Sequence, residues 1–335
     1  MMKLEEIGTR ARQAEPVLRI METEKKNRVL KKAAENLVAD AETIIAANAL
    51  DMEHGKEKGM SQGLLDRLFL DKSRIEAMAE GMCQVSELDD PIGEVLGMKK
   101  RPNGLLIGQK RVPLGVVGII YEARPNVTAD AFALCFKTGN VVILKGGSDA
   151  IHSNTAIVAS LRKTLKEEQV PEDALLLIED TSRETTAQFM KMNRYVDVLI
   201  PRGGAGLIRA VVENSTIPVI ETGTGNCHVY VDEYADIDMA VKVIYNAKTS
   251  RIGVCNACES LVIHKAVAKQ AIPLIVNALK EKNVEVRGDE YAMQCDSRIV
   301  PASDDDWGME YLDYIISVKT VDSVDEAIEH INTYN

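Results

Sequence analysis

Residues 116–147, VVGIIYEARPNVTADAFALCFKTGNVVILKGG, decide the fold class. Within them the β-rich run Val116–Tyr121 is followed by a helical pattern at Ala129–Phe136 and by a second β-rich run at Val141–Lys145. This alternation predicts βαβ units, and therefore an α/β protein with a mostly parallel sheet covered on both faces. Further strands are expected downstream, separated mostly by helical patterns, at Leu175–Ile178, Val196–Ile200, His228–Val231, Glu259–Ile263 and Asp313–Val318.

The chain is predicted to begin with a helical layer over residues 3–90. That stretch has no proline after residue 16, and apolar residues such as Leu30, Ala33 and Leu37 recur at helical spacing. Next, Arg101–Gly104 places an Asn-Gly pair between two extendable runs, a strong signal for a β-hairpin. Two interpretations stay open: a solvated hairpin with basic flanks, or an arm that pairs with another subunit.

The composition is that of an ordinary globular protein. The length of 335 residues suggests about two domains, and 46% hydrophobic with 27% charged residues argues against a disordered or fibrous chain. The longest apolar run, 114–121, is far too short to span a membrane, and residues 1–15 lack the apolar core of a signal peptide. Forty basic and fifty-one acidic residues give a net charge of −11, which argues against a general nucleic-acid surface. We therefore expect a cytoplasmic protein without a membrane or nucleic-acid partner.

Three motifs follow predicted strands, where ligands of parallel sheets gather. In Tyr121–Thr128, Asn126 either caps the next helix or donates its amide to an oxyanion. In Val141–Ser148, a lysine and two glycines suit a phosphate or ribose group, although a plain turn is the alternative. In Pro201–Gly206, backbone N–H groups suit an anion. Neither this run nor Gly223-Thr224-Gly225 matches the G-x-G-x-x-G dinucleotide fingerprint.

A fourth motif, Arg251–Glu259, contains Cys255 and Cys258 in a C-x-x-C arrangement. A zinc site would need two further ligands, such as Cys227 and His228, and no second C-x-x-C exists, so no metal site is predicted. A redox dithiol and an inert buried cysteine are two other interpretations.

The remaining interpretation of this motif is a single nucleophilic thiol at Cys255. The nearby charge of Arg251 and local N–H dipoles would increase the thiolate fraction there. Cys258 is expected to be inert. With only six cysteines and no export signal, we expect reduced thiols throughout.

Taken together, these segments resemble the γ-glutamyl phosphate reductases of the aldehyde dehydrogenase superfamily. The similarity is dense between residues 90 and 264, where the family's blocks occur in the same order, at Arg101–Gly104, Val112–Gly115, Tyr121–Thr128, Leu144–Gly147, Pro201–Gly206, Glu221–Val231 and Gly253–Ala257. The resemblance implies an aldehyde-dehydrogenase-like fold. It divides the chain into an NADP-binding domain over 1–225, with a hairpin oligomerisation arm at 96–112, and a catalytic domain over 226–335. Because family chains continue for roughly eighty residues more, we expect the catalytic domain to be incomplete here.

The resemblance also assigns roles. Cys255 matches the nucleophile, Asn126 the oxyanion-hole asparagine, and Glu221 a glutamate that acts as a base in hydrolytic aldehyde dehydrogenases. Arg124 and Arg251 are candidates for binding the acyl phosphate or the α-carboxylate, with structural ion pairs as the alternative. NADPH is the implied cofactor, although Lys145 suits a 2′-phosphate and a ribose hydroxyl alike, and its expected site comprises Lys145, Gly146, Gly147, Ser148, Gly203, Gly204 and Gly223.

The expected reaction is the reduction of L-glutamyl 5-phosphate to L-glutamate 5-semialdehyde and phosphate through a Cys255 thioester. This is the second step of proline biosynthesis from glutamate. A homo-oligomer, and substrate transfer from glutamate 5-kinase, are the implied partnerships. Three other hypotheses stay open: an acylating aldehyde dehydrogenase with another acyl donor, a non-catalytic fragment, and a dithiol protein using Cys255 and Cys258.

Overall fold

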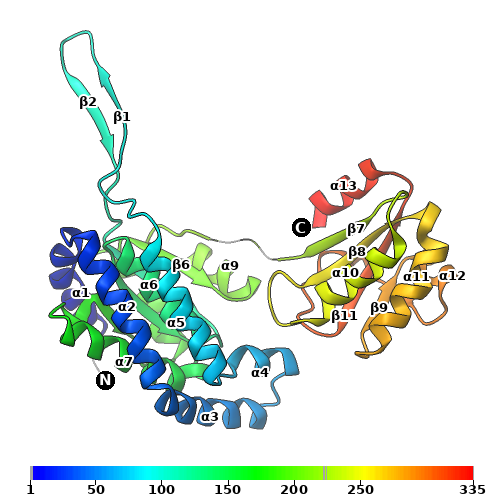
Figure 1. Cartoon of the computed structure of the whole chain (residues 1–335), viewed down its shortest axis with the longest axis horizontal. Coiled ribbons are helices and arrows are strands. Elements are labelled where there is room, and N and C mark those ends of the chain that lie inside the picture. The colour runs from blue at the N-terminus through cyan, green and yellow to red at the C-terminus, as the bar shows by residue number, and fades with distance from the viewer. Residues whose placement is uncertain (1–2, 222, 224, 335) are drawn as a thin grey trace. The chain divides into compact units, whose positions relative to one another are not determined.

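The computed structural model describes residues 3–221, 223 and 225–334. These residues form two units, each with its own parallel sheet (Figure 1). The first unit comprises residues up to Met60 together with 68–222, and the second comprises Ser61–Arg67 together with 223–335. The α/β fold class predicted from the sequence is confirmed, and each unit has a parallel sheet of its own beside the separate two-stranded hairpin.

The amino-terminal helical layer is present as predicted. Leu30, Ala33 and Leu37 are fully buried, which is the result expected for one face of an amphipathic helix. The helices of this region are α1 (Leu4–Arg19), α2 (Thr23–Ala39), α3 (Ala41–Glu57), α4 (Gln62–Leu68) and α5 (Lys72–Glu87). All but α4 lie within the first unit, and most of α4 belongs to the second.

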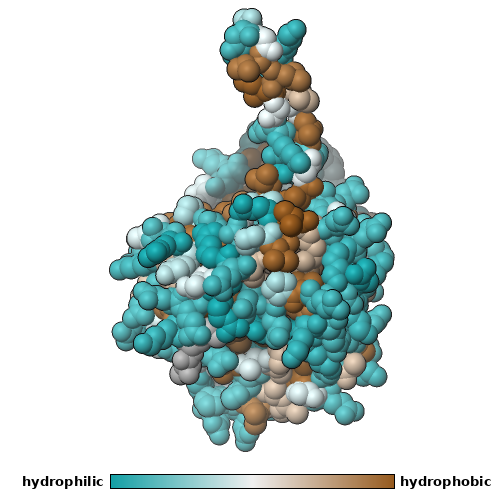
Figure 2. All heavy atoms as spheres, turned by 90° about the vertical axis from the view of Figure 1, so that its left-hand side faces the viewer, coloured by the Kyte–Doolittle hydropathy of each residue, from teal (hydrophilic) through white to brown (hydrophobic). Residues whose placement is uncertain are grey.

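The predicted hairpin is a long two-stranded arm that projects from the first unit (Figure 1). It is formed by β1 (Val95–Lys100) and β2 (Leu106–Lys110), which pair antiparallel. Gly104 takes a φ of +89° in the turn, a conformation that glycine adopts without strain. Every residue of both strands is exposed, and Figure 2 shows apolar side chains gathered on the arm. The exposed apolar residues of the arm and its base are Val95, Leu96, Met98, Leu105, Leu106, Ile107, Val112 and Leu114.

The first unit is built on a four-stranded parallel sheet in the order β5-β4-β3-β6. The strands are β3 (Val116–Tyr121), β4 (Val141–Gly146), β5 (Leu175–Leu177) and β6 (Val198–Arg202). β3 and β4 are buried along their whole length, as continuous apolar strands of parallel sheets are. The helices around the sheet are α6 (Asn126–Lys137), α7 (Ile151–Glu167), α8 (Arg183–Phe189) and α9 (Ala205–Asn214).

The strand order determines where a ligand can enter this sheet. The chain passes from β3 to β4 and β5 on one side, and then returns to place β6 on the other side of β3. A parallel sheet binds ligands in the crevice that opens where the strand order reverses, outside the carboxyl ends of the strands. That position lies between β3 and β6, where Tyr121 pairs with Arg202.

The second unit has a five-stranded parallel sheet in the order β10-β9-β11-β8-β7. Its strands are β7 (Cys227–Val231), β8 (Cys258–His264), β9 (Glu285–Gly288), β10 (Val300–Pro301) and β11 (Ile315–Val321). Its helices are α10 (Ile237–Thr249), α11 (Lys265–Lys280), α12 (Glu290–Cys295) and α13 (Val324–Tyr334). The sequence did not predict β9 and β10, which are short. Among the described residues, no helix is both long and apolar enough to cross a membrane.

Candidate functional site

Cys255 lies in a turn between α10 and β8, three residues before the strand begins. The Ala257 backbone N–H donates to the Val254 carbonyl at 3.1 Å, which closes the turn. The Cys255 residue is exposed, whereas β8 itself is buried up to Ile263. The turn therefore holds an exposed cysteine just before a buried strand, a position that suits a nucleophile.

Side chains of helix α4 bind the residues just before Cys255. The Arg67 Nε donates to the Gly253 carbonyl oxygen, and the Arg251 guanidinium pairs with Asp66 at 3.2 Å. Arg251, a predicted substrate ligand, therefore already has a carboxylate partner. Both side chains of that pair are substantially exposed, so an incoming anion can compete with the carboxylate of Asp66.

A buried ion pair fixes the start of β8. The Lys248 Nζ, on α10, lies 2.6 Å from Glu259 Oε2, and both side chains are at most 1% exposed. The Leu312 backbone N–H donates to the other carboxylate oxygen at 3.1 Å. Burial raises the pKa of Glu259, and the Lys248 ammonium opposes that rise. The pair ties α10, β8 and the 312 segment together next to the Cys255 turn.

The other two cysteines near Cys255 differ from each other. Cys258 is buried, its thiol donates to the Ser260 carbonyl at 3.4 Å, and burial raises its pKa to about 12. The inert role expected for it agrees with this burial. Cys227 is half-buried, and its thiol donates to the Cys255 carbonyl oxygen at 3.2 Å.

Asn126 is the first residue of α6, in the first unit. It does not cap the helix. Its amide Nδ2 instead donates to Asp130 Oδ2 at 3.0 Å, one turn along α6. An amide nitrogen carries two hydrogens, so this bond leaves one for another acceptor. The residue is exposed, as an oxyanion donor must be.

Glu122, directly after β3, carries a carboxylate that the sequence did not single out. Glu122 Oε2 accepts the Gly204 backbone N–H at 2.9 Å, next to the amino terminus of α9. A methyl group on Gly203 would lie 2.7 Å from the same oxygen, so a side chain there would require the Glu122 carboxylate to move. The two residues are 82 positions apart, and no local pattern links them.

Lys145 is the next-to-last residue of β4, the strand beside β3, and is buried. Its Nζ donates to the Gly146 carbonyl at 3.1 Å and forms no ion pair among the described residues. Burial lowers the pKa of Lys145, with Asp180 acting in the opposite direction. A buried ammonium beside glycine turns fits an anionic or hydroxyl-rich ligand such as a nicotinamide dinucleotide.

The remaining predicted residues are spread over both units. Glu221, Gly223 and Ser148 are exposed, and Arg124 is half-buried. Arg124 lies in a tight turn after β3, in which its backbone N–H donates to the Glu122 carbonyl at 2.6 Å. Within the first unit, the carboxyl ends of β3, β4 and β6 lie side by side. Within the second unit, Cys227 lies next to Cys255 and Cys258.

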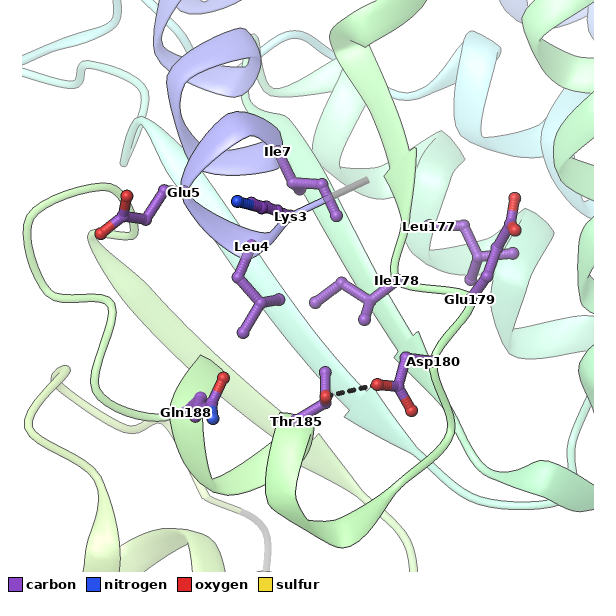
Figure 3. Close-up of a pocket in the computed structure, with 10 residues that line it drawn as sticks. All are labelled: Lys3, Leu4, Glu5, Ile7, Leu177, Ile178, Glu179, Asp180, Thr185 and Gln188. Atoms are coloured by element: carbon purple, nitrogen blue, oxygen red, sulfur yellow. Dashed lines mark hydrogen bonds between the residues drawn. The ribbon is translucent and has the colours of Figure 1, made fainter. Parts of the chain in front are cut away.

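A cavity of about 670 Å³ lies elsewhere, between α1 and the β5–α8 connection (Figure 3). Leu4, Ile7 and Ile178 line it, and Thr185 donates to Asp180 at 2.7 Å at its rim. None of the residues predicted for catalysis or binding lines this cavity, so its size alone does not make it the site. No cluster of metal-binding side chains is found in the part of the chain that the structure describes.

The sequence pattern of the aldehyde dehydrogenase family matches residues 2–305. The chain belongs to this family. A γ-glutamyl phosphate reductase from Lachnospira eligens is 71% identical over the whole chain, which covers 81% of that protein. One from Agathobacter rectalis is 58% identical, again with the whole chain covering 81%. The resemblance drawn from the sequence is confirmed, and with it the assignment as an oxidoreductase of the aldehyde dehydrogenase type.

Solved structures agree with the family assignment. The crystal structure of γ-glutamyl phosphate reductase from Thermotoga maritima is 47% identical and superposes with a TM-score of 0.88, covering 100% of this chain and 81% of that one. A propionaldehyde dehydrogenase from Rhodopseudomonas palustris, 18% identical with a TM-score of 0.71, is covered over 78% of its length by the whole of this chain and shares the fold. The aldehyde dehydrogenase fold predicted for the chain is confirmed.

Proposed function

We propose that the protein reduces L-glutamyl 5-phosphate to L-glutamate 5-semialdehyde and phosphate, with NADPH as the reductant. This reaction is the second step of proline biosynthesis from glutamate. The observation that carries the proposal is the exposed Cys255 thiol on a braced turn, in a chain 71% identical to a γ-glutamyl phosphate reductase.

The Cys255 thiolate attacks the acyl phosphate carbonyl, and the carbon–oxygen bond to phosphate breaks to give a γ-glutamyl thioester. When bound, the dinucleotide supplies the hydride that reduces this acyl group. A proton then returns to the sulfur as the aldehyde leaves, and Cys255 is regenerated. Water must be kept from the thioester, because hydrolysis would waste it, and the reduction consumes no water and so needs no base that activates water. We therefore give Glu221 a role in managing the thiol proton or positioning the nicotinamide.

Asn126 and the Cys255 backbone N–H are the proposed oxyanion donors. One such donor typically contributes about 3 kcal/mol to a transition state. Asn126 is exposed and has a hydrogen left after its bond to Asp130.

The proposed cofactor site is the crevice at the carboxyl ends of the first sheet. Lys145 would hold a ribose hydroxyl or 2′-phosphate, and backbone N–H groups of two glycine turns would hold the diphosphate. The residues assigned to it are Lys145, Gly146, Gly147, Ser148, Gly203, Gly204 and Gly223. Arg124 and Arg251 are assigned to the substrate's phosphate or α-carboxylate.

The hairpin arm is proposed to pair with another copy of the chain. An isolated two-stranded ribbon is marginally stable, and exposed apolar strands gain from being covered. Substrate transfer from glutamate 5-kinase and a cytoplasmic location stay predictions.

Mass spectrometry tests the nucleophile directly. The protein is incubated with an activated γ-glutamyl ester without cofactor and is then mapped by peptide. A γ-glutamyl adduct on Cys255, absent from the variant Cys255→Ser, is the expected result. An adduct on Cys227 or Cys258 instead would contradict the proposed mechanism. A comparison of acyl phosphates of different chain length tests the substrate, and indifference to the γ-glutamyl group would favour another acylating aldehyde dehydrogenase.

A further inference from the structure

A second thiol, that of Cys227, contacts the backbone of Cys255 in the second unit. Cys227 begins β7, and its thiol donates to the carbonyl oxygen of Cys255 at 3.2 Å. Cys255 is exposed and Cys227 is half-buried, so small oxidants can reach both. The proposed reduction uses only one of these two sulfurs.

The backbones of the two cysteine segments also lie close together. A methyl group placed on Gly225 would lie 2.6 Å from the Cys255 carbonyl oxygen and 3.0 Å from the Cys255 Cβ. The segment that leads into Cys227 therefore runs directly against the Cys255 side chain. A disulfide needs Cα atoms about 4.4–6.8 Å apart. The backbones run side by side here, and the Cys227 thiol already contacts the Cys255 backbone, so the two cysteines lie on adjacent segments.

Cys258 does not offer the same opportunity. It pairs with Cys227 in the β7–β8 register, but it is only 2% exposed and its thiol is bonded to the Ser260 carbonyl. Although Cys255 and Cys258 are close in sequence, burial removes Cys258 from contact with oxidants. The geometry favours the distant partner, Cys227, over the neighbour in the C-x-x-C motif.

We propose that Cys227 is a resolving cysteine, which forms a reversible disulfide with Cys255 when a peroxide oxidises the nucleophile. The disulfide itself depends only on the contact between the two residues. Its effect on turnover rests on the function proposed above.

The chemistry proceeds in two steps. The Cys255 thiolate attacks one peroxide oxygen, the O–O bond breaks, and the leaving hydroxide takes a proton to become water. Cys255 is now a sulfenic acid. The Cys227 sulfur loses its proton and attacks the Cys255 sulfur, the S–O bond breaks, and a second water leaves. Two thiols are oxidised to a disulfide while one hydrogen peroxide is reduced to two waters.

The surroundings of Cys227 affect the second step. Burial raises the pKa of Cys227, and so do Cys255, Glu259 and Glu310. The attacking thiolate is therefore scarce at neutral pH, and disulfide formation should quicken as the pH rises. A sulfenic acid that waits at Cys255 is open to a second peroxide, which would take it to sulfinic acid.

Non-reducing peptide mapping after treatment with hydrogen peroxide tests the proposal. Free thiols are blocked with iodoacetamide before trypsin digestion. We expect a link between peptides 210–242 and 252–265, about 2 Da lighter than their sum. Dithiothreitol should restore iodoacetamide labelling of Cys255, and the link should form faster at pH 9 than at pH 7.

Two variants make the result specific. In Cys227→Ser, and in Cys227→Ala as a second replacement, excess peroxide should carry Cys255 to a product about 32 Da heavier that dithiothreitol does not reverse. Cys258→Ser, the matched control, should keep the link. A link between Cys255 and Cys258, or recovery of Cys255 that does not require Cys227, would overturn the proposal. Masses and labelling are read without turnover, so failure of the proposed reductase reaction would leave this test unaffected.

Discussion

Replacing Lys248 with methionine should destabilise the second unit strongly and in a pH-dependent way. Lys248→Met keeps most of the side-chain volume but leaves Glu259 buried, 1% exposed, with one hydrogen bond from the Leu312 N–H. Breaking a buried pair by removing one partner typically costs about 3–5 kcal/mol.

The structure allows this magnitude to be checked by a second route. Without Lys248, the buried carboxyl of Glu259 takes up a proton rather than remain charged. Protonating a carboxyl with an ordinary pKa of 4.5 costs about 3 kcal/mol at pH 7 and about 1 kcal/mol at pH 5, at about 1.4 kcal/mol per unit. Because the folded-state pKa is raised, the stability of the variant is lost as the pH rises above 4.5. The loss relative to the unsubstituted protein should therefore be larger at pH 7 than at pH 5.

Urea denaturation followed by tryptophan fluorescence measures this loss. The chain has one tryptophan, Trp307, which is buried in the second unit and therefore reports its unfolding. Lys248→Met/Glu259→Gln removes both charges and keeps an acceptor for the Leu312 N–H, so it should regain most of the stability and lose the pH dependence. Lys265→Met is the matched exposed control, because Lys265 lies 2.6 Å from Asp322 at the surface, and it should cost no more than about 1 kcal/mol.

Two outcomes would refute this reasoning. The first is a loss below about 1 kcal/mol at pH 7, which would place the pair in the energy range of surface ion pairs. The second is an equal loss at pH 5 and pH 7, which would mean that Glu259 does not take up a proton when Lys248 is removed.

Three further changes test other parts of the molecule. Gly225→Ala should greatly slow acylation of Cys255, because the new methyl group meets the Cys255 carbonyl at 2.6 Å; acylation at the unsubstituted rate would contradict that crowding. Asn126→Ala should slow the same acylation by about 10²–10³-fold, and an unchanged rate would remove Asn126 from the oxyanion hole. Burial lowers the pKa of His330 to about 4, and the nearby His228 and Lys319 act in the same direction. The neutral imidazole of His330 should therefore contribute fully to the stability above pH 6.5, and this contribution should be lost as the pH falls toward 4. Urea midpoints of His330→Phe should lack that dependence, and an unaltered pH profile would show that another group causes it.

Much of the fold could be predicted because its signals are local. Val116–Tyr121 matches β3 residue for residue, since a continuous apolar run bounded by turns predicts a buried strand. The Asn-Gly pair likewise located the hairpin. In contrast, β9 and β10 span four and two residues and carry little apolar pattern. The order of the strands within each sheet was not predicted, because strand pairing depends on contacts between residues far apart in the sequence.

The site could be predicted only where a short motif carried the chemistry. The turn-like surroundings of Cys255 agree with its exposed position, and its role as the nucleophile stays a prediction. Glu122 was missed, because its partner Gly204 is 82 residues away and an acidic residue after a strand is unremarkable by itself. Lys248 was missed for a related reason. A lysine in an amphipathic helix is normally solvated, and only the facing Glu259 explains why this one is buried.

The participation of Ser61–Arg67 in the second unit has a practical consequence for dissecting the protein. Asp66 and Arg67 of this segment bind Arg251 and the Gly253 carbonyl, which lie more than 180 residues further along the chain. A fragment expressed from residue 223 onward would contain Cys255 but lack Ser61–Arg67, the segment whose side chains bind the neighbouring loop. Cutting the gene at residue 223 would therefore yield two incomplete pieces, and the second unit would have to be supplied with helix α4 in trans or by fusion.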